Sequence, residues 1–159
     1  MYRSIQQFIE NLDITKISED RKINLEDFIG FIAQKLKSKE TVNLNFICTH
    51  NSRRSHFSQI WAQTIVEFLA IENINSFSGG TEATAVYHSV LNAFQNIGFS
   101  VGRLSENENP VSFLKYANDA PPIVCFSKVY DHPFNPKTNF AAVMTCSQAN
   151  EACPFVPGA

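Results

Sequence analysis

The chain has 159 residues, of which 44% are hydrophobic and 18% charged, a composition typical of one globular domain with a single buried core. The formal net charge is -2, which excludes a global basic field of the kind that binds nucleic acid or an anionic membrane. No apolar run approaches the roughly 20 residues that span a bilayer, and the N-terminus lacks the continuous apolar stretch of a signal peptide.

The N-terminal part of the chain predicts two amphipathic helices within residues 1–39. Apolar residues recur at helical spacing between Ile5 and Leu12, and again between Leu25 and Leu36. Residues 42–47 then alternate apolar and polar side chains, which indicates a strand. From Ser55, a suitable helix N-cap, the apolar residues return to a helical period that runs to Leu69.

The rest of the chain continues this alternation. The expected elements are a short strand that ends at Gly79-Gly80, a helix over 86–97 that stops at Gly98, a short helix over 111–117, and strands within the apolar runs 121–130 and 139–146. Strands that alternate with helices predict an α/β fold with a parallel sheet between helical layers. In such a sheet ligands bind beyond the carboxyl ends of the strands, which is where Cys48 lies.

The segment CTHNSRRS, residues 48–55, joins a predicted strand to a predicted helix. Five residues separate Cys48 from Arg54, so the loop can curl with its N–H groups inward and form a nest for a tetrahedral oxyanion. The helix N-terminus and the guanidinium favour the thiolate form of Cys48. Arg54 can also offer two parallel N–H bonds to the oxyanion. The alternative is a surface loop with a stray cysteine.

The remaining loop residues complete the predicted oxyanion site: Thr49, His50, Asn51, Ser52 and Arg53. Asn51 and Ser52 belong to residue types that accept tight loop conformations and bond to the backbone. Ser55 can stabilise Cys48 as a leaving group when a covalent intermediate breaks. Arg53 is expected to point into solvent, with an enlarged positive pocket as the alternative, and His56 is expected on the helix surface.

CTHNSRRS resembles the Cys-x5-Arg-Ser loop of low-molecular-weight protein tyrosine phosphatases and of the thioredoxin-coupled arsenate reductases that share their fold. The segment SFSGGTEAT, residues 76–84, is similar to the Ser-Ala-Gly-Thr turn of that family. The resemblance covers about residues 42–157. It implies a three-layer sandwich with a central four-stranded parallel sheet, within a single domain of residues 1–159 in which residues 1–40 form a helical extension of the core at 41–159.

Two loop positions depart from the family pattern. His50 stands where the family usually has glycine, and Arg53 stands where a second cysteine is common. A histidine with positive φ would strain the loop, although histidine tolerates that conformation better than a branched residue.

Four cysteines without an expected signal peptide predict reduced thiols in the cytoplasm. Cys125 is expected in the core. Cys146 and Cys153, in TCSQANEACP, resemble the redox helix of thioredoxin-coupled arsenate reductases. Seven helical residues span about 10.5 Å, whereas a disulfide needs Cα atoms roughly 4.4–6.8 Å apart, so this pair can close only if the helix unwinds. Inert thiols are the alternative; a zinc site lacks the required spacing and further ligands.

The resemblance implies that Cys48, Arg54, Ser55, Cys146 and Cys153 reduce arsenate to arsenite, with thioredoxin as reductant and with no metal or cofactor. Phosphate and sulfate are expected to bind the same loop. Relatives carry an Asp-Pro general acid after the redox segment, beyond residue 159, so the chain is expected to lack that segment. Asp131 is the nearest substitute, with a loop role favoured.

Two other functions stay open at this point. One is a low-molecular-weight phosphotyrosine phosphatase-like hydrolase, which would need Cys48, Arg54 and an aspartate but neither Cys146 nor Cys153. The other is a non-catalytic oxyanion-binding protein. The N-terminal helices leave two roles open, a homodimer interface or a cover over the site.

Overall fold

Two sheets of three strands each organise the fold in a computed structural model that describes residues 1–152 and 155–159. The parallel sheet has the order β2-β1-β6, formed by β1 (Val42–Cys48), β2 (Ile74–Gly80) and β6 (Ala141–Met144). The antiparallel sheet has the order β3-β4-β5, formed by β3 (Ser100–Arg103), β4 (Ser112–Lys115) and β5 (Ile123–Cys125). This arrangement confirms an α/β fold with a parallel sheet.

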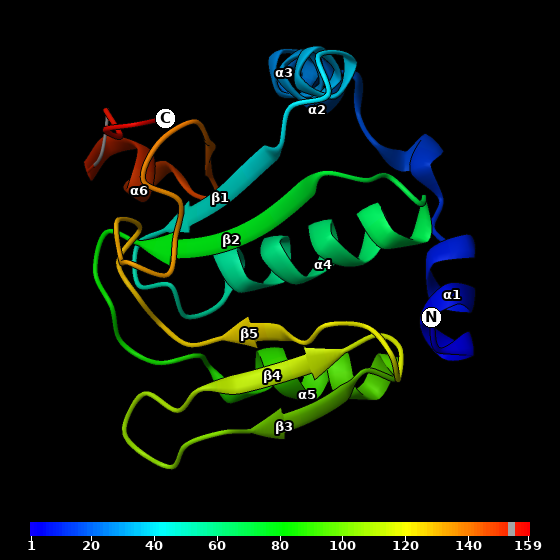
Figure 1. The fold of residues 1–159 in the computed structure, drawn as a ribbon, viewed down its shortest axis with the longest axis vertical. Helices are drawn as coiled ribbons and strands as arrows, with labels where there is room; N and C mark the ends of the chain where they lie inside the picture. The colour runs from blue at the N-terminus through cyan, green and yellow to red at the C-terminus, as the bar shows by residue number, and fades with distance from the viewer. Residues whose placement is uncertain (153–154) are drawn as a thin grey trace.

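Helices cover both sheets. They are α1 (Arg3–Glu10), the 3-10 helix η1 (Ile14–Lys16), α2 (Glu19–Ile23), α3 (Glu26–Lys37), α4 (Arg54–Phe68), α5 (His88–Ile97) and α6 (Ser147–Ala152). Helices α3, α4 and α6 contact β1, whereas α5 contacts β3. Figure 1 shows α4 between the parallel sheet and the antiparallel sheet, with α2 and α3 at the opposite end of the molecule from β3. None of the described helices combines the length and the apolar character needed to cross a membrane.

The largest apolar cluster lies where α4 and α5 meet the antiparallel sheet. Its centre is aromatic, because Trp61 on α4 contacts the rings of Phe94 and Phe99 at centroid distances of 5.4 and 5.9 Å. Helix α1 joins this cluster and buries Ile5 and Ile9 in it. The burial of apolar area in this cluster therefore holds the first helix to the rest of the fold.

Gly98 ends α5 and lets α1 approach closely. It has φ 114°, which glycine adopts without the steric cost that a Cβ brings, as the helix stop predicted there requires. A Cβ at this position would lie 1.9 Å from Ser4 Oγ on α1. A side chain here would therefore force Ser4 to move from its place against α5.

A second apolar cluster fixes β1, the strand that leads to the candidate site. Val42, Leu44 and Phe46 alternate along β1 and pack with apolar residues of α3 and α4. Strand β1 is central in its sheet and is hydrogen-bonded on both sides. The carboxyl end of β1 is consequently fixed by packing and by two ladders.

Two predicted elements differ in the structure. Residues 111–117 were expected to be helical, but β4 pairs with β3 and β5 and alternates buried and half-buried residues with the period of a strand. Strand β5 was expected in the parallel sheet but pairs antiparallel with β4, and among the described residues a single bridge, Gly80 to Val129, connects the run after it to β2. The parallel sheet therefore has three strands, where four were predicted.

Candidate functional site

The loop between β1 and α4 has its carbonyl groups turned outward. The Cys48 carbonyl accepts from Thr81 N (3.1 Å), and the Thr49 carbonyl accepts from Glu82 N (2.9 Å). Further along the loop, the His50 carbonyl accepts from the hydroxyls of Ser127 (2.9 Å) and Thr84 (3.2 Å), and the Ser52 carbonyl accepts from Tyr87 N (3.0 Å). Donors from separate parts of the chain thus hold the outer side of the loop.

The inner side of the loop presents N–H groups. A trans peptide places its C=O and its N–H on opposite sides, so the outward carbonyls of Cys48, Thr49, His50 and Ser52 turn the N–H groups that follow them inward. Within the described part of the chain, the N–H groups of His50, Asn51, Ser52 and Arg53 have no hydrogen-bond partner. Consecutive N–H groups that point into one concavity form a nest for an anion.

Asn51 provides the sharp turn of the loop. Its φ is 43°, in the left-handed region that asparagine adopts more readily than most residues. The sequence pattern points to His50 as the position that would need positive φ, whereas in the structure Asn51 has it. The Asn51 side chain is buried and bonded at both ends, because Oδ1 accepts from Lys128 N (2.9 Å) and Nδ2 donates to Ser55 Oγ (2.8 Å).

Ser55 receives this hydrogen bond and lies against the cysteine. Its Oγ is 3.1 Å from Cys48 Sγ. Because Ser55 Oγ already accepts from Asn51, its own hydrogen can point at the sulfur, where it stabilises negative charge. The prediction that Ser55 is the N-cap of α4 is wrong: the helix begins at Arg54, and Ser55 is buried one residue inside it.

Gly80 allows the loop to lie directly on the end of β2. A Cβ at Gly80 would be 2.6 Å from the Thr49 carbonyl oxygen and 2.7 Å from Asn51 N. Both of these are backbone atoms, which a rotamer change cannot move. Gly80 is thus explained by the close approach of the loop, whereas a Cβ at Gly79 would lie 2.4 Å from Tyr130 Cα; both glycines end β2 rather than form a turn.

His56 was expected on the surface of α4, and this expectation was wrong. The side chain is 0% exposed, with Nε2 3.0 Å from the Asn51 carbonyl and Nδ1 3.3 Å from Ser78 Oγ. Since the carbonyl only accepts, Nε2 carries the hydrogen and Nδ1 accepts from the hydroxyl. Burial, with the nearby charge of Lys128, lowers the pKa of His56 from 6.5 to about 3.

Acid is therefore expected to destabilise the protein through His56. The folded state holds the neutral ring, whereas the unfolded state takes up a proton near pH 6.5, so stability falls as the pH falls from about 6.5 toward 3. The slope due to this group approaches about 1.4 kcal/mol per pH unit. Urea unfolding across this range should be markedly less pH-dependent in His56→Gln than in the wild type. Equal slopes for the two proteins would contradict a buried neutral histidine.

His50 and Arg53 point away from the loop centre. His50 Nε2 is 2.8 Å from Glu82 Oε1, and both side chains are more than half exposed, so the pair adds little stability. The Arg53 guanidinium lies over the ring of Tyr87, 5.6 Å from its centroid. Arg53 is exposed, as predicted.

Cys146 lies at the same edge of the sheet as Cys48. Strands β1 and β6 pair Ile47 with Met144, so Cys48 and Cys146 follow by one and two residues respectively. Thr49 Oγ1 is 3.7 Å from Cys146 Sγ. Burial acts to raise the pKa of Cys146, but hydrogen bonds from Ala149 N–H and from Thr49, together with the charge of Arg54, outweigh it and lower the pKa.

The remaining predicted site residues are the other cysteines and the candidate acid Asp131. Cys48, Cys125 and Cys146 are unpaired, and Cys153 lies outside the described residues. Cys125 belongs to the core, as predicted, and burial raises its pKa to about 12. Asp131 is exposed in the loop before β6, and within the described ranges no hydrogen bond or ion pair joins its carboxylate to the Cys48 loop.

A large open cavity adjoins the loop. It has a volume of about 920 Å³, and its lining includes Arg54, Phe57 and Ser58 from α4 together with Met144, Thr145 and Cys146. The cavity thus contains the loop arginine and the second thiol. Arg53 is not part of the lining.

Lys128 is the residue that sequence reasoning missed most completely. It is 2% exposed, and its ammonium group lies over the rings of Phe126 and Phe134 at 4.7 and 5.6 Å from their centroids. Burial lowers the pKa of Lys128 to about 8. The Lys128 backbone bonds to both the loop and β2, because its N–H donates to Asn51 Oδ1 and its carbonyl accepts from Gly80 N.

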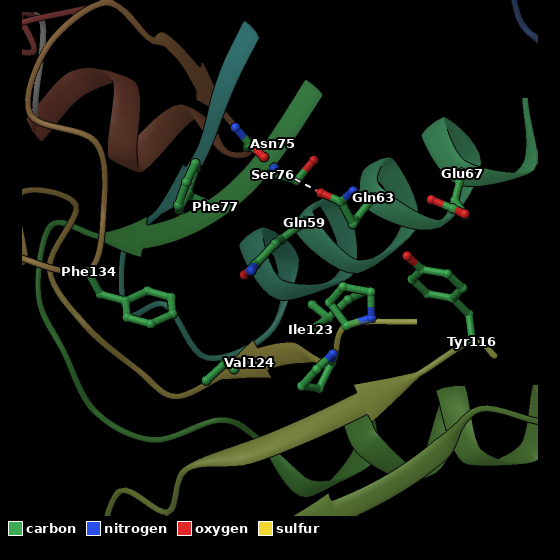
Figure 2. Close-up of a pocket in the computed structure, with 12 residues that line it drawn as sticks. Gln59, Gln63, Glu67, Asn75, Ser76, Phe77, Tyr116, Ile123, Val124 and Phe134 are labelled. Atoms are coloured by element: carbon green, nitrogen blue, oxygen red, sulfur yellow. Dashed lines mark hydrogen bonds between the residues drawn. The ribbon is translucent and has the colours of Figure 1, made fainter. Parts of the chain in front are cut away.

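A second cavity, of about 360 Å³, lies away from the Cys48 loop (Figure 2). Gln59 and Gln63 of α4 face it together with Phe77 of β2 and Tyr116. Among the described residues that line it, none carries a thiol, imidazole or guanidinium group. This cavity therefore offers no thiol nucleophile from the described residues, unlike the sheet edge that carries Cys48 and Cys146.

Comparisons with known proteins add no relative. No protein-family model, curated protein or solved structure matches the chain.

Within residues 1–152 and 155–159, no group of three or more His, Cys, Asp or Glu side chains is placed to hold a metal ion.

Proposed function

We propose that the chain is an arsenate reductase of the thioredoxin-coupled type, on a fold like that of the low-molecular-weight phosphatases. The observation that carries the proposal is the loop from Cys48 to Arg54, whose inward N–H groups have no partner among the described residues. A tetrahedral oxyanion is the ligand that such a nest accommodates. Cys48 and Cys146 at one sheet edge favour a redox reaction over simple anion binding.

The first step joins the oxyanion to Cys48. The loop N–H groups and the Arg54 guanidinium hold arsenate while the Cys48 thiolate attacks arsenic. A sulfur–arsenic bond forms, and an arsenic–oxygen bond breaks, with the oxygen leaving as water after protonation. The Ser55 hydroxyl, 3.1 Å from the sulfur, stabilises negative charge on Cys48 before attack and again when the adduct breaks.

The second step reduces arsenic. The Cys146 thiolate attacks the Cys48 sulfur, a disulfide forms, and the electron pair of the sulfur–arsenic bond remains on arsenic, which leaves as arsenite. The lowered pKa of Cys146 increases the fraction of attacking thiolate. Cys153 then attacks Cys146 and releases Cys48 as thiolate. Thioredoxin reduces the Cys146–Cys153 disulfide, in a reducing compartment such as the cytoplasm.

The decisive test is disulfide mapping and intact mass of the reduced protein after arsenate is added. The expected result is the loss of two thiol hydrogens, with a Cys48–Cys146 or Cys146–Cys153 disulfide. Cys48→Ser should show no oxidation, and Cys146→Ser should stop before the disulfide forms. No arsenate-driven oxidation of the wild type would refute the reductase proposal. If the protein then hydrolyses an aryl phosphate and Cys146→Ser keeps this activity, the protein is a phosphatase. If it binds phosphate without turnover, it is a non-catalytic oxyanion-binding protein.

A further inference from the structure

The region of α2 contributes to the lining of the large cavity beside Cys146. Arg21 and Asn24, on or just after α2, line the cavity that also contains Arg54 and Cys146. The sequence left open whether these helices form a dimer interface or cover the site. Arg21 lies far from Arg54 in the chain, so the fold brings the two guanidinium groups to one cavity.

The cavity is positively charged. The described residues of its lining include two guanidinium groups and no carboxylate. Among residues 1–152 and 155–159, neither Arg21 nor Arg54 has an ion-pair partner. Two uncompensated charges at one opening raise the local concentration of anions and depress that of cations.

This charge discriminates between the substrate and the product of the proposed reaction. Arsenate carries negative charge near neutral pH, whereas arsenous acid is neutral. A cavity lined by two guanidinium groups attracts arsenate by charge but does not attract neutral arsenous acid in this way. Charge in this cavity therefore assists substrate entry without slowing product release.

We propose that Arg21 is a specificity-determining residue, which together with Arg54 makes this cavity an entry site for small anions in front of Cys146. The role of arsenate as the physiological anion rests on the proposed function. The preference of the cavity for anions does not, because it follows from the two guanidinium groups alone. The two parts can therefore be tested separately.

A pair of alkylating reagents measures the charge preference without arsenate. Iodoacetate is an anion and iodoacetamide is neutral, and both react with the same Cys146 thiolate. The ratio of their rates at Cys146, measured by peptide mass spectrometry, thus cancels the thiolate fraction and reports the electrostatic environment. In the wild type this ratio should exceed that of an unstructured cysteine peptide, and it should fall with added salt.

Arg21→Gln should lower the iodoacetate-to-iodoacetamide ratio at Cys146 about threefold, the order expected of one unit charge at short range near a protein surface. Arg21→Lys keeps the charge and should keep the ratio. The matched control is Lys22→Gln, because Lys22 pairs with Glu19 at 2.7 Å and does not line the cavity. Inorganic phosphate should protect Cys146 from iodoacetate less in Arg21→Gln than in the wild type.

The proposal is overturned if the wild-type ratio matches that of the peptide, or if Arg21→Gln and Lys22→Gln change it equally. If the iodoacetate-to-iodoacetamide ratio at Cys146 falls equally in Arg21→Gln and Arg21→Lys, Arg21 acts through structure rather than charge. This result also overturns the proposal. If the ratio behaves as expected but arsenate causes no oxidation, the entry site stands and the reductase proposal fails.

Discussion

Replacing Arg54 with lysine should lower kcat/KM for arsenate by about 10²–10³-fold, the effect typical of removing one donor to a developing oxyanion. The guanidinium offers two parallel N–H bonds to two oxygens, whereas an ammonium group is a point charge that cannot match this geometry. Charge is kept, so any loss measures the geometry of the contact. Steady-state reduction of arsenate coupled to thioredoxin gives the value.

Arg53→Lys is the matched control for this prediction, because it makes the same change at the adjacent residue. Arg53 is exposed over the ring of Tyr87 and does not line the cavity with Cys146. Its replacement should change kcat/KM by less than about threefold, the range of exposed charge effects. If both variants lose activity equally, Arg54 has no special part in holding the oxyanion.

Asn51→Ala should lower the free energy of unfolding by about 3 kcal/mol and abolish most of the activity. Alanine is strained in the left-handed conformation at φ 43°. It also removes the side-chain amide that bonds to Lys128 N and to Ser55 Oγ. The hydrogen bond from the amide, which directs the Ser55 hydroxyl toward Cys48, is lost in this variant. Urea unfolding and arsenate turnover measure the two effects.

Asn51→Gly separates the two causes. Glycine accepts φ 43° without strain but also lacks the amide, so it should recover about 1–2 kcal/mol of stability relative to alanine. Activity should stay low in both variants, because both lose the hydrogen bond to Ser55. Full activity in Asn51→Gly would show that the amide does not position Ser55.

The strand, loop and helix around Cys48 could be predicted because their signals are local. Alternation over residues 42–47, helical periodicity after Ser55 and the Cys-x5-Arg spacing all lie within one short segment. β4 was mistaken for a helix because a short apolar run has no distinctive period, and its strand state depends on pairing with β3 and β5. The number of strands in the parallel sheet also depends on pairing between distant segments, because β5 pairs with β4 instead of joining that sheet.

The support of the loop could not be read from the sequence. Ser127, Thr84 and Lys128 reach the loop from positions distant in the chain, and nothing in a serine, threonine or lysine marks such a contact. His56 was misplaced for a related reason. The buried side of the first turns of α4 carries Ser55, His56 and Gln59, so hydropathy alone assigns these polar residues to the surface.

One of the two hydroxyls that donate to the His50 carbonyl comes from Ser127, which is 77 residues further along the chain. During synthesis, the ribosome makes Cys48 well before the residues that shape the loop around it. A nascent chain that has not reached Lys128 lacks the N–H that fixes Asn51, and with it the ordered contact between Ser55 and Cys48. The order of translation thus delays the formation of the nucleophile site until most of the chain has emerged.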